Sequence, residues 1–246
     1  MHLKILLLIY SLLAFPVSVF GIEPDWSEYD LLLDKYVSEE VRSGIPVNWV
    51  DYSAISQDPA FKTIVQSIEA FPVEQLEGHA EILSFYINAY NILAIKMVLD
   101  HWPLSSIKDA GTWLKPVWDK PAGTIGGRQV TLGMIEHEIL RRMDEPQVHM
   151  AIVCASLSCP DLRREAYRAE ILEGQLEDQT QRFLGNTAKG LRVEKGKVIV
   201  SIIFDWFKED FSGEDGIEVF IRRYIDIPGD ITLKAGIPYN WDLNGS

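Results

Sequence analysis

One stretch near the middle of the chain restricts how the rest of it can fold. Residues 81–95 read EILSFYINAYNILAI, so the helix that this composition favours is apolar on nearly every face. Such a helix is stable in water only when other elements cover it on most sides. The sequence therefore predicts a long helix over 73–97 that lies buried inside the protein.

A polar stripe interrupts this helix. Its members recur every three or four residues, which places them on one helix face: Glu81, Ser84, Asn88 and Asn91. Buried amides need hydrogen-bond partners, and two interpretations satisfy that need. Either the stripe ties the helix to a neighbouring loop, or it lines a cleft in which Asn88 and Asn91 bind the substrate or Asn88 orients the catalytic histidine.

Residues 1–21 have the layout of a cleavable signal peptide. Lys4 gives a positively charged start, residues 5–15 are apolar with one interruption, and Pro16 breaks the run before Gly21. The run is shorter than the about 20 residues that span a bilayer, and no cysteine directly follows it to accept a lipid. We expect cleavage after Gly21, a secreted or periplasmic location and no stable membrane anchor.

The remaining residues, 22–246, are expected to form a single domain, because no repeat or long linker divides them. The formal net charge of the chain is −13. That balance argues against nucleic acid and anionic membrane surfaces as partners. Two cysteines exclude a disulfide-dense scaffold, and no motif with metal-ligand or phosphate-binding spacing occurs. We therefore expect no metal and no cofactor; the oligomeric state is left open.

Helices precede hairpins along the chain, which favours an α+β fold with a helical N-terminal half packed on a small antiparallel sheet of hairpins. Helical patterns cover 25–42, 58–70, 73–97, 132–143, 165–184, 205–211 and 219–224. Extended patterns cover 48–52, 148–155 and the tail 237–244, and hairpin patterns cover 123–131 and 191–203.

Four stretches resemble a family of bacterial and plant proteins, the domain of unknown function DUF547. They are FYINAYN at 85–91, LGMIEHEILR at 132–141, VHMAIVCASLSCPDLR at 148–163 and SIIFDWFKEDF at 201–211. The resemblance implies a core similar to papain-like or transglutaminase-like cysteine hydrolases. It further implies that Cys154 is the nucleophile and His137 its base, with Glu136 a candidate to orient the histidine.

The residues around Cys154 allow the same chemistry and an alternative to it. A cysteine attacks as the thiolate, so it needs a base or a positive field nearby. Cys154 enters a loop of small residues whose backbone N–H groups are candidates to form an oxyanion hole. Ser156 and Cys159 in the same loop are candidates to bind the substrate. Alternatively Cys154 is a small buried hydrophobic residue, or it forms a disulfide with Cys159 in an oxidising compartment.

Strand alternation bears on the nearby histidines. In a strand over 148–155, His149 and Cys154 point to opposite faces, so we expect a structural role for His149 unless a bulge intervenes. The role of His137 as the base is what the resemblance implies. Helix and strand lengths place Cys154 nearer the N-terminus of the helix over 132–143 than His137, and a helix N-terminus also lowers a thiol pKa, so which group activates Cys154 stays open.

Asp210 is expected to be a surface carboxylate. The aromatic residues after position 200 are candidates for the wall of a cleft, although most of them are expected to pack in the core: Trp206, Tyr224, Tyr239 and Trp241.

Two hypotheses for the function follow. The first is an exported cysteine-dependent hydrolase or transferase that acts on an amide or peptide-like bond of a small-molecule or peptide-like substrate. The second is a non-catalytic exported binding module in which the cysteines are structural.

Overall fold

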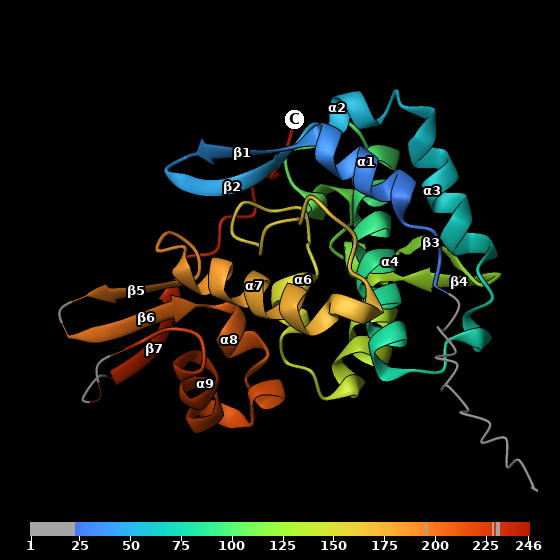
Figure 1. Ribbon diagram of the computed structural model, residues 1–246. Coiled ribbons are helices and arrows are strands. Elements are labelled where there is room, and N and C mark those ends of the chain that lie inside the picture. Colours follow the sequence, from blue (N-terminus) through green and yellow to red (C-terminus); the bar gives the residue numbers. More distant parts are fainter. Residues whose placement is uncertain (1–22, 195, 228, 230–231) are drawn as a thin grey trace, which may run out of the picture.

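A single buried helix forms the centre of the fold (Figure 1). The computed structural model of the chain describes residues 23–194, 196–227, 229 and 232–246; the predicted signal peptide, 1–21, lies outside the described residues. Helix α4 spans His79–Asp100 and buries most of its length, including Ile87, Ile92 and Val98. It is long and apolar enough to cross a membrane, but its apolar window is mostly covered by the rest of the protein. The prediction of a buried central helix is therefore confirmed.

The helix begins later than the sequence pattern suggested. Residues Val73–Gln75 form a separate 3-10 turn, and α4 starts after Gly78. The carboxylate of Glu81 accepts hydrogen bonds from the backbone N–H groups of Glu77 and Gly78 at 3.2 and 3.3 Å. This member of the polar stripe thus serves as the N-terminal cap of the helix.

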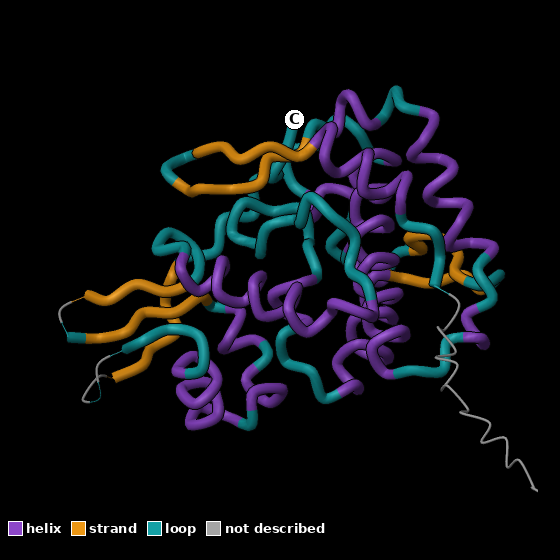
Figure 2. Tube along the Cα trace, in the orientation of Figure 1, coloured by secondary structure: helices purple, strands orange, loops and turns teal. Residues whose placement is uncertain are grey.

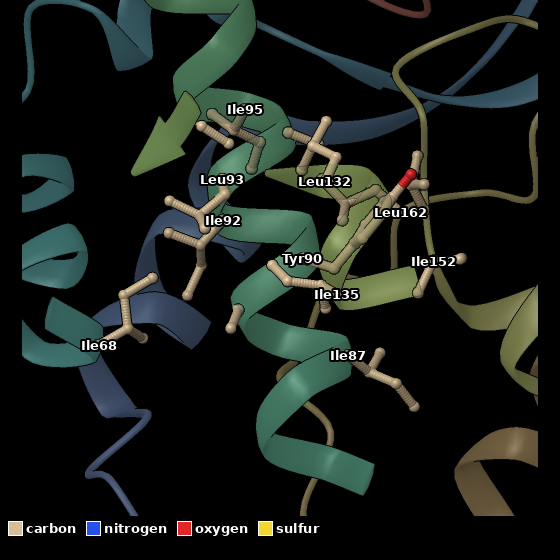
Figure 3. Close-up of a cluster of buried hydrophobic side chains, with 14 of the residues drawn as sticks. Ile68, Ile87, Tyr90, Ile92, Leu93, Ile95, Leu132, Ile135, Ile152 and Leu162 are labelled. Carbon is tan, nitrogen blue, oxygen red and sulfur yellow. The ribbon is translucent and has the colours of Figure 1, made fainter. Parts of the chain in front are cut away.

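The N-terminal elements and one hairpin cover α4. They are α1 (Ser27–Tyr36), α2 (Tyr52–Ile55), α3 (Pro59–Ala70), β3 (Pro121–Ile125) and β4 (Arg128–Thr131). Their apolar side chains and those of α4 form one continuous hydrophobic cluster. Figure 3 shows why α4 has to be apolar all round, since the side chains of Ile87, Tyr90, Ile92 and Ile95 leave it on different sides.

A second hydrophobic cluster lies beside the first. It is built on a three-stranded sheet, β5 (Leu191–Glu194), β6 (Lys197–Ser201) and β7 (Thr232–Ile237), with the helices α7 (Leu172–Gly185), α8 (Ile203–Trp206) and α9 (Gly213–Arg222). Strands β5 and β6 are antiparallel, but β6 and β7 are parallel. The α+β class is confirmed.

The single antiparallel sheet that we expected is wrong. In the described residues the strands form two separate two-stranded hairpins and the mixed three-stranded sheet. Both predicted hairpins are present, and the turn of the first uses Gly126 and Gly127 at φ +54° and +75°, a region that glycine enters without strain. The error concerns how the hairpins assemble, which local patterns do not encode.

Two predicted elements change type. The helix expected over 25–42 ends at Tyr36, and β1 (Val37–Arg42) pairs with β2 (Ile45–Val50) across a turn in which Gly44 has φ +77°. The strand expected over 148–155 begins instead as a short helix, α6 (Val148–Ala151). A brief apolar run fits a buried helical turn as well as a strand, and here the tertiary contacts selected the turn.

The helix expected over 132–143 exists but is irregular. The hydroxyl of Thr131 caps it by accepting the N–H of Met134 at 3.0 Å, as predicted. It then passes through α5 (Leu132–Met134), a π-helical segment (Ile135–Ile139) and a 3-10 turn (Leu140–Met143). Single π-helical turns are frequent where a helix carries functional side chains.

Two asparagines of the polar stripe attach a long loop to α4. The segment between α6 and α7 runs largely without helix or strand (Figure 2). The amide of Asn91 donates to the carbonyl of Ala151 at 3.0 Å and accepts the N–H of Val153 at 2.8 Å. Asn88 makes the same pair of bonds with the backbone of Tyr167, at 2.8 and 2.9 Å. Of the two interpretations of the stripe, the structural one accounts for both amides.

We expect Asn91→Ala to lower the free energy of unfolding by about 2 to 4 kcal/mol, because it leaves a buried carbonyl and a buried N–H unpaired. Urea unfolding measures the change. Asn88→Ala is the matched control: we expect a similar loss of stability, but altered alkylation of Cys154 only in Asn91→Ala, since Asn91 holds the segment that leads into Cys154. A loss below about 0.5 kcal/mol, the range of ordinary surface changes, would contradict this role.

Candidate functional site

A pocket of about 210 Å³ lies where the two hydrophobic clusters meet. Helix α4, the π-helical segment, the loop after α6, helix α8 and the C-terminal tail all contribute to it. The lining consists of Tyr90, Trp118, Glu136, His137, His149, Ile152, Cys154, Cys159, Pro160, Ile203, Trp206, Phe207, Tyr239 and Trp241. Every residue of the predicted Cys154, His137 and Glu136 group is therefore on this pocket.

The C-terminal tail holds the Cys154 loop in place. Leu157 donates its N–H to the carbonyl of Asp242 at 2.9 Å, and Asn244 donates to Ala155 at 3.1 Å. Ala155, directly after the cysteine, has φ +55°, a left-handed conformation that is uncommon for alanine. The loop therefore turns sharply at the cysteine, and residues more than 80 positions away in the sequence fix that turn.

Three polar side chains surround the sulfur of Cys154. Its Sγ lies 3.0 Å from Cys159 Sγ and 3.1 Å from the hydroxyl of Tyr239. Ser156 lies 3.3 Å away and donates its own proton to Tyr239 at 2.8 Å, which leaves the Tyr239 O–H free to point at the sulfur. The hydrogen bond from Cys159 lowers the pKa of the Cys154 thiol, whereas burial raises that of Cys159. Cys154 is thus the sulfur that ionises, and Cys159 the thiol that donates to it.

The two cysteines are thiols in this structure. Their sulfurs are 3.0 Å apart, and a disulfide bond is about 2.05 Å long. The disulfide that the sequence left open is therefore not formed here. The backbone N–H of Cys154 donates to Cys159 Sγ at 2.9 Å, and those of Val153, Leu157 and Ser158 also have partners. The N–H groups of these four residues are therefore not free to form the predicted oxyanion hole.

A histidine–aspartate pair lies on the same pocket. His149 is 3 % exposed, its ring stacks on Phe207, and its Nε2 lies 2.7 Å from the carboxylate of Asp210. Arg141 holds the same carboxylate with two hydrogen bonds, at 2.6 and 2.9 Å. Burial alone would raise the pKa of Asp210, but the bonds from His149 and Arg141 hold it well below its usual range.

This arrangement fixes the tautomer of His149. An ionised carboxylate only accepts hydrogen bonds, so Nε2 of His149 carries the proton and donates to Asp210. Burial lowers the pKa of His149, partly offset by the Asp210 hydrogen bond, and the ring is neutral near pH 7. Its Nδ1 then carries a lone pair. The prediction that strand geometry turns His149 away from the site is wrong, because residues 148–151 are helical and His149 and Cys154 line one pocket.

His137 has the opposite arrangement. Arg141 Nη1 lies 3.0 Å from His137 Nδ1, and a guanidinium only donates, so Nδ1 accepts and Nε2 carries the proton. Burial and the neighbouring Arg141 lower the pKa of His137. The lone pair that a base needs is therefore occupied, and His137 offers the pocket an N–H donor.

Glu136 does not orient His137. It is 6 % exposed and accepts a hydrogen bond from the hydroxyl of Tyr90 on α4 at 3.3 Å. Burial raises the pKa of Glu136 to about 7. The carboxylate that does orient a histidine is Asp210. The sequence placed Asp210 on a helix surface, because a carboxylate in a short polar helix gives no local sign of a distant partner.

The other predicted site residues divide into two groups. Cys159 and Ser156 contact Cys154 directly. Asn88 and Asn91 are outside the pocket lining, and their amides are taken up by backbone groups. Among the described residues no group of three or more His, Cys, Asp or Glu side chains is arranged to hold a metal ion.

Comparison with known proteins identifies a family but no relative of known structure. Residues 73–184 match the model of the family described as "Protein of unknown function, DUF547". The matched range includes α4, the π-helical segment with Glu136 and His137, and the Cys154 loop. No curated protein and no solved structure matches the chain. The papain-like or transglutaminase-like core implied by the sequence resemblance therefore has no support here.

We expect Cys159→Ala to raise the pH midpoint of Cys154 alkylation, because the variant loses the thiol that donates to the Cys154 sulfur. In the unchanged protein the midpoint is expected below about 8.5, the ordinary thiol value. Iodoacetamide labelling across pH, mapped to each cysteine by mass spectrometry, measures it. Cys159→Ser keeps a donor at this position and should retain most of the lowered midpoint. Identical profiles for the alanine variant and the unchanged protein would refute the role of Cys159.

Glu136→Gln should change how stability depends on pH. The pKa of Glu136 is raised from 4.5 to about 7 on folding, so the folded protein holds this proton more tightly. The resulting stabilisation is complete below pH 4.5 and is lost as the pH rises through 7, roughly 3 kcal/mol in all. Glutamine mimics the neutral acid at every pH. We expect the variant to gain stability relative to the unchanged protein between pH 5 and pH 8 in urea unfolding; a pH-independent difference would contradict this.

Proposed function

Because residues 73–184 match the DUF547 family, whose function is unknown, we propose the activity of the chain from the geometry of the pocket. We propose that the protein is an exported cysteine-dependent hydrolase or transferase that acts on an amide or peptide-like bond. The observation that carries the proposal is a cysteine of lowered thiol pKa on the same pocket as a histidine that an aspartate orients. Export rests on the signal-peptide layout of residues 1–21.

In the proposed reaction His149 is the general base, replacing His137 in the role that the sequence suggested. Cys154 Sγ attacks the substrate carbonyl carbon, and its proton passes to the lone pair of His149 Nδ1. Asp210 stabilises the imidazolium that forms. The carbon–nitrogen bond then breaks, and the amine leaves with the proton from His149. The thioester on Cys154 is released by water in hydrolysis, or by an amine acceptor in transfer, and His149 again accepts the proton.

No hydrogen bond joins Cys154 to His149 or His137 in the described part of the chain. The lack of such a hydrogen bond in the free protein is compatible with catalysis, since catalytic hydrogen bonds often form or tighten only when substrate is bound. The backbone N–H groups of Val153, Cys154, Leu157 and Ser158 are engaged, and in this proposal side chains on the pocket lining donate to the developing oxyanion. The Nε2–H of His137 and the hydroxyl of Tyr239 are the donors that we assign to this role.

The pocket favours a small apolar or aromatic group on the substrate. Its volume of about 210 Å³ suits one side chain or short acyl group. Tyr239 and Trp241 lie 4.5 Å apart between ring centroids, and Trp206 stacks on Trp241 at 5.8 Å. These aromatic rings form a continuous wall on which an apolar group can pack.

The burial of Cys154 favours the second candidate, a non-catalytic binding module. Cys154 is 9 % exposed, and most buried cysteines are structural. In that case the aromatic wall still binds an apolar group, but no covalent intermediate forms. The two candidates therefore differ in whether Cys154 becomes acylated.

We expect p-nitrophenyl acetate to acetylate Cys154 and water to release the acetyl group. Mass spectrometry of the Cys154 peptide follows both steps. His149→Ala should slow acylation about a hundredfold or more, the usual contribution of a general base, and Asp210→Asn should slow it as well.

His137→Ala should slow acylation too, because it removes a proposed oxyanion donor, but it leaves the base. The two variants are therefore compared across pH: the rise in acylation rate as the base deprotonates should be kept in His137→Ala and lost in His149→Ala. Loss of that rise in His137→Ala, or its persistence in His149→Ala, would refute the assignment of the base, and the lack of any Cys154 adduct would favour the binding module.

A further inference from the structure

Two large apolar side chains stand almost fully in solvent at one tight turn. Trp113 is 93 % exposed and Leu114 is 84 % exposed, the highest values among the large exposed hydrophobic residues of the described chain. Both flanking residues, Thr112 and Lys115, are exposed as well. Single exposed hydrophobic residues are ordinary on protein surfaces, but an adjacent tryptophan and leucine at this exposure call for a partner.

Hydrogen bonds hold this turn in shape. Thr112 donates its N–H to the carbonyl of Lys115 at 2.9 Å, and Lys115 donates its N–H to the hydroxyl of Thr112 at 3.0 Å. Trp113 and Leu114 occupy the two central positions between these bonds. The turn therefore presents both side chains outward on a fixed base, so little conformational entropy is lost when they are buried.

The base of the turn is anchored beside the pocket. On its N-terminal side, Lys108 lies over the ring of Trp241, 4.7 Å from its centroid. On its C-terminal side, Trp118 lies edge-on to Trp241 at 5.6 Å. Both Trp118 and Trp241 line the pocket. The tip that carries Trp113 thus projects from the segment that forms one rim of the pocket.

We propose that the turn 112–115 docks on the surface of a lipid bilayer and inserts Trp113 and Leu114 at the interface. Area argues for lipid over a protein partner. Two side chains of this size offer at most about 400 Å², about half of the roughly 800 Å² that each partner contributes to a stable protein complex. A bilayer interface needs no matching surface, and tryptophan is the side chain most enriched there.

The local charge suits the same partner. Residues 108–120 contain three lysines and two aspartates, in a chain whose net charge is −13. The excess of acidic residues therefore lies outside this segment. The Lys115 side chain can extend its charged end toward lipid headgroups while its hydrocarbon stem lies along the apolar tip. Contact through two side chains is weak and reversible, which agrees with the expectation of no stable membrane anchor. The proposal does not rest on the activity proposed for Cys154.

Flotation with phosphatidylcholine vesicles tests the proposal. The protein is recovered from the exporting cell and its N-terminus sequenced, because an uncleaved apolar leader would bind lipid by itself. We expect the double variant Trp113→Ala/Leu114→Ala to lower the partition coefficient about tenfold or more, the order expected when large apolar side chains lose their burial. Leu31→Ala is the matched control, since Leu31 is 72 % exposed on α1, and it should bind as the unchanged protein does.

Four results would overturn the proposal. The first is that the unchanged protein does not bind vesicles, and the second is that the double variant binds them as well as the unchanged protein does. The third is loss of vesicle binding in about 1 M salt, where the Debye length is about 3 Å, because this would show that charge and not the apolar side chains causes the binding. The fourth is self-association in sedimentation experiments, abolished in the double variant, by a protein that does not bind vesicles. The partner would then be a second copy of the chain. Circular dichroism of each variant verifies that the fold is retained.

Discussion

The candidate site depends on two hydrogen bonds through which the side chain of Asn91 on α4 pairs with the backbone that leads to Cys154. Asn91 of α4 donates to Ala151 and accepts from Val153, as a paired strand would, so the segment leading to Cys154 needs no sheet beside it. A buried backbone without such partners would be strongly destabilised. Because α4 is apolar on its other faces and covered on most of them, the asparagine amide is held rigidly. The cysteine is therefore positioned by the core itself.

The second constraint is the junction of two hydrophobic clusters. The cluster around α4 supplies Cys154 and Tyr90, and the cluster around the three-stranded sheet supplies Phe207. His149 and Asp210 meet at this junction, where Phe207 stacks on the imidazole. Charged groups in such a place have to be paired. The Arg141 bonds to Asp210 satisfy that need. The bond between His149 and Asp210 sets the proton position of His149, and a separate bond from Arg141 sets that of His137.

Local sequence patterns predicted the elements that local energetics decide. The buried helix, the Gly126-Gly127 hairpin turn and the Thr131 cap all follow from side-chain periodicity, glycine conformation and capping chemistry. Predictions failed where distant contacts decide. The run 148–155 fits helix or strand equally well by itself, and that single error turned His149 away from a pocket that it lines together with Cys154.

By itself, the sequence determined that α4 is buried, that its amides need partners, and that the two cysteines, Cys154 and Cys159, lie five residues apart in one short segment. It also determined the charge of the chain and the signal-peptide layout. Only the tertiary structure decided which groups meet. Asp210 is 61 residues from His149, and Tyr239 is 85 from Cys154. Hydrogen bonds over such separations depend on how the two clusters and the tail pack, and no local pattern records that packing.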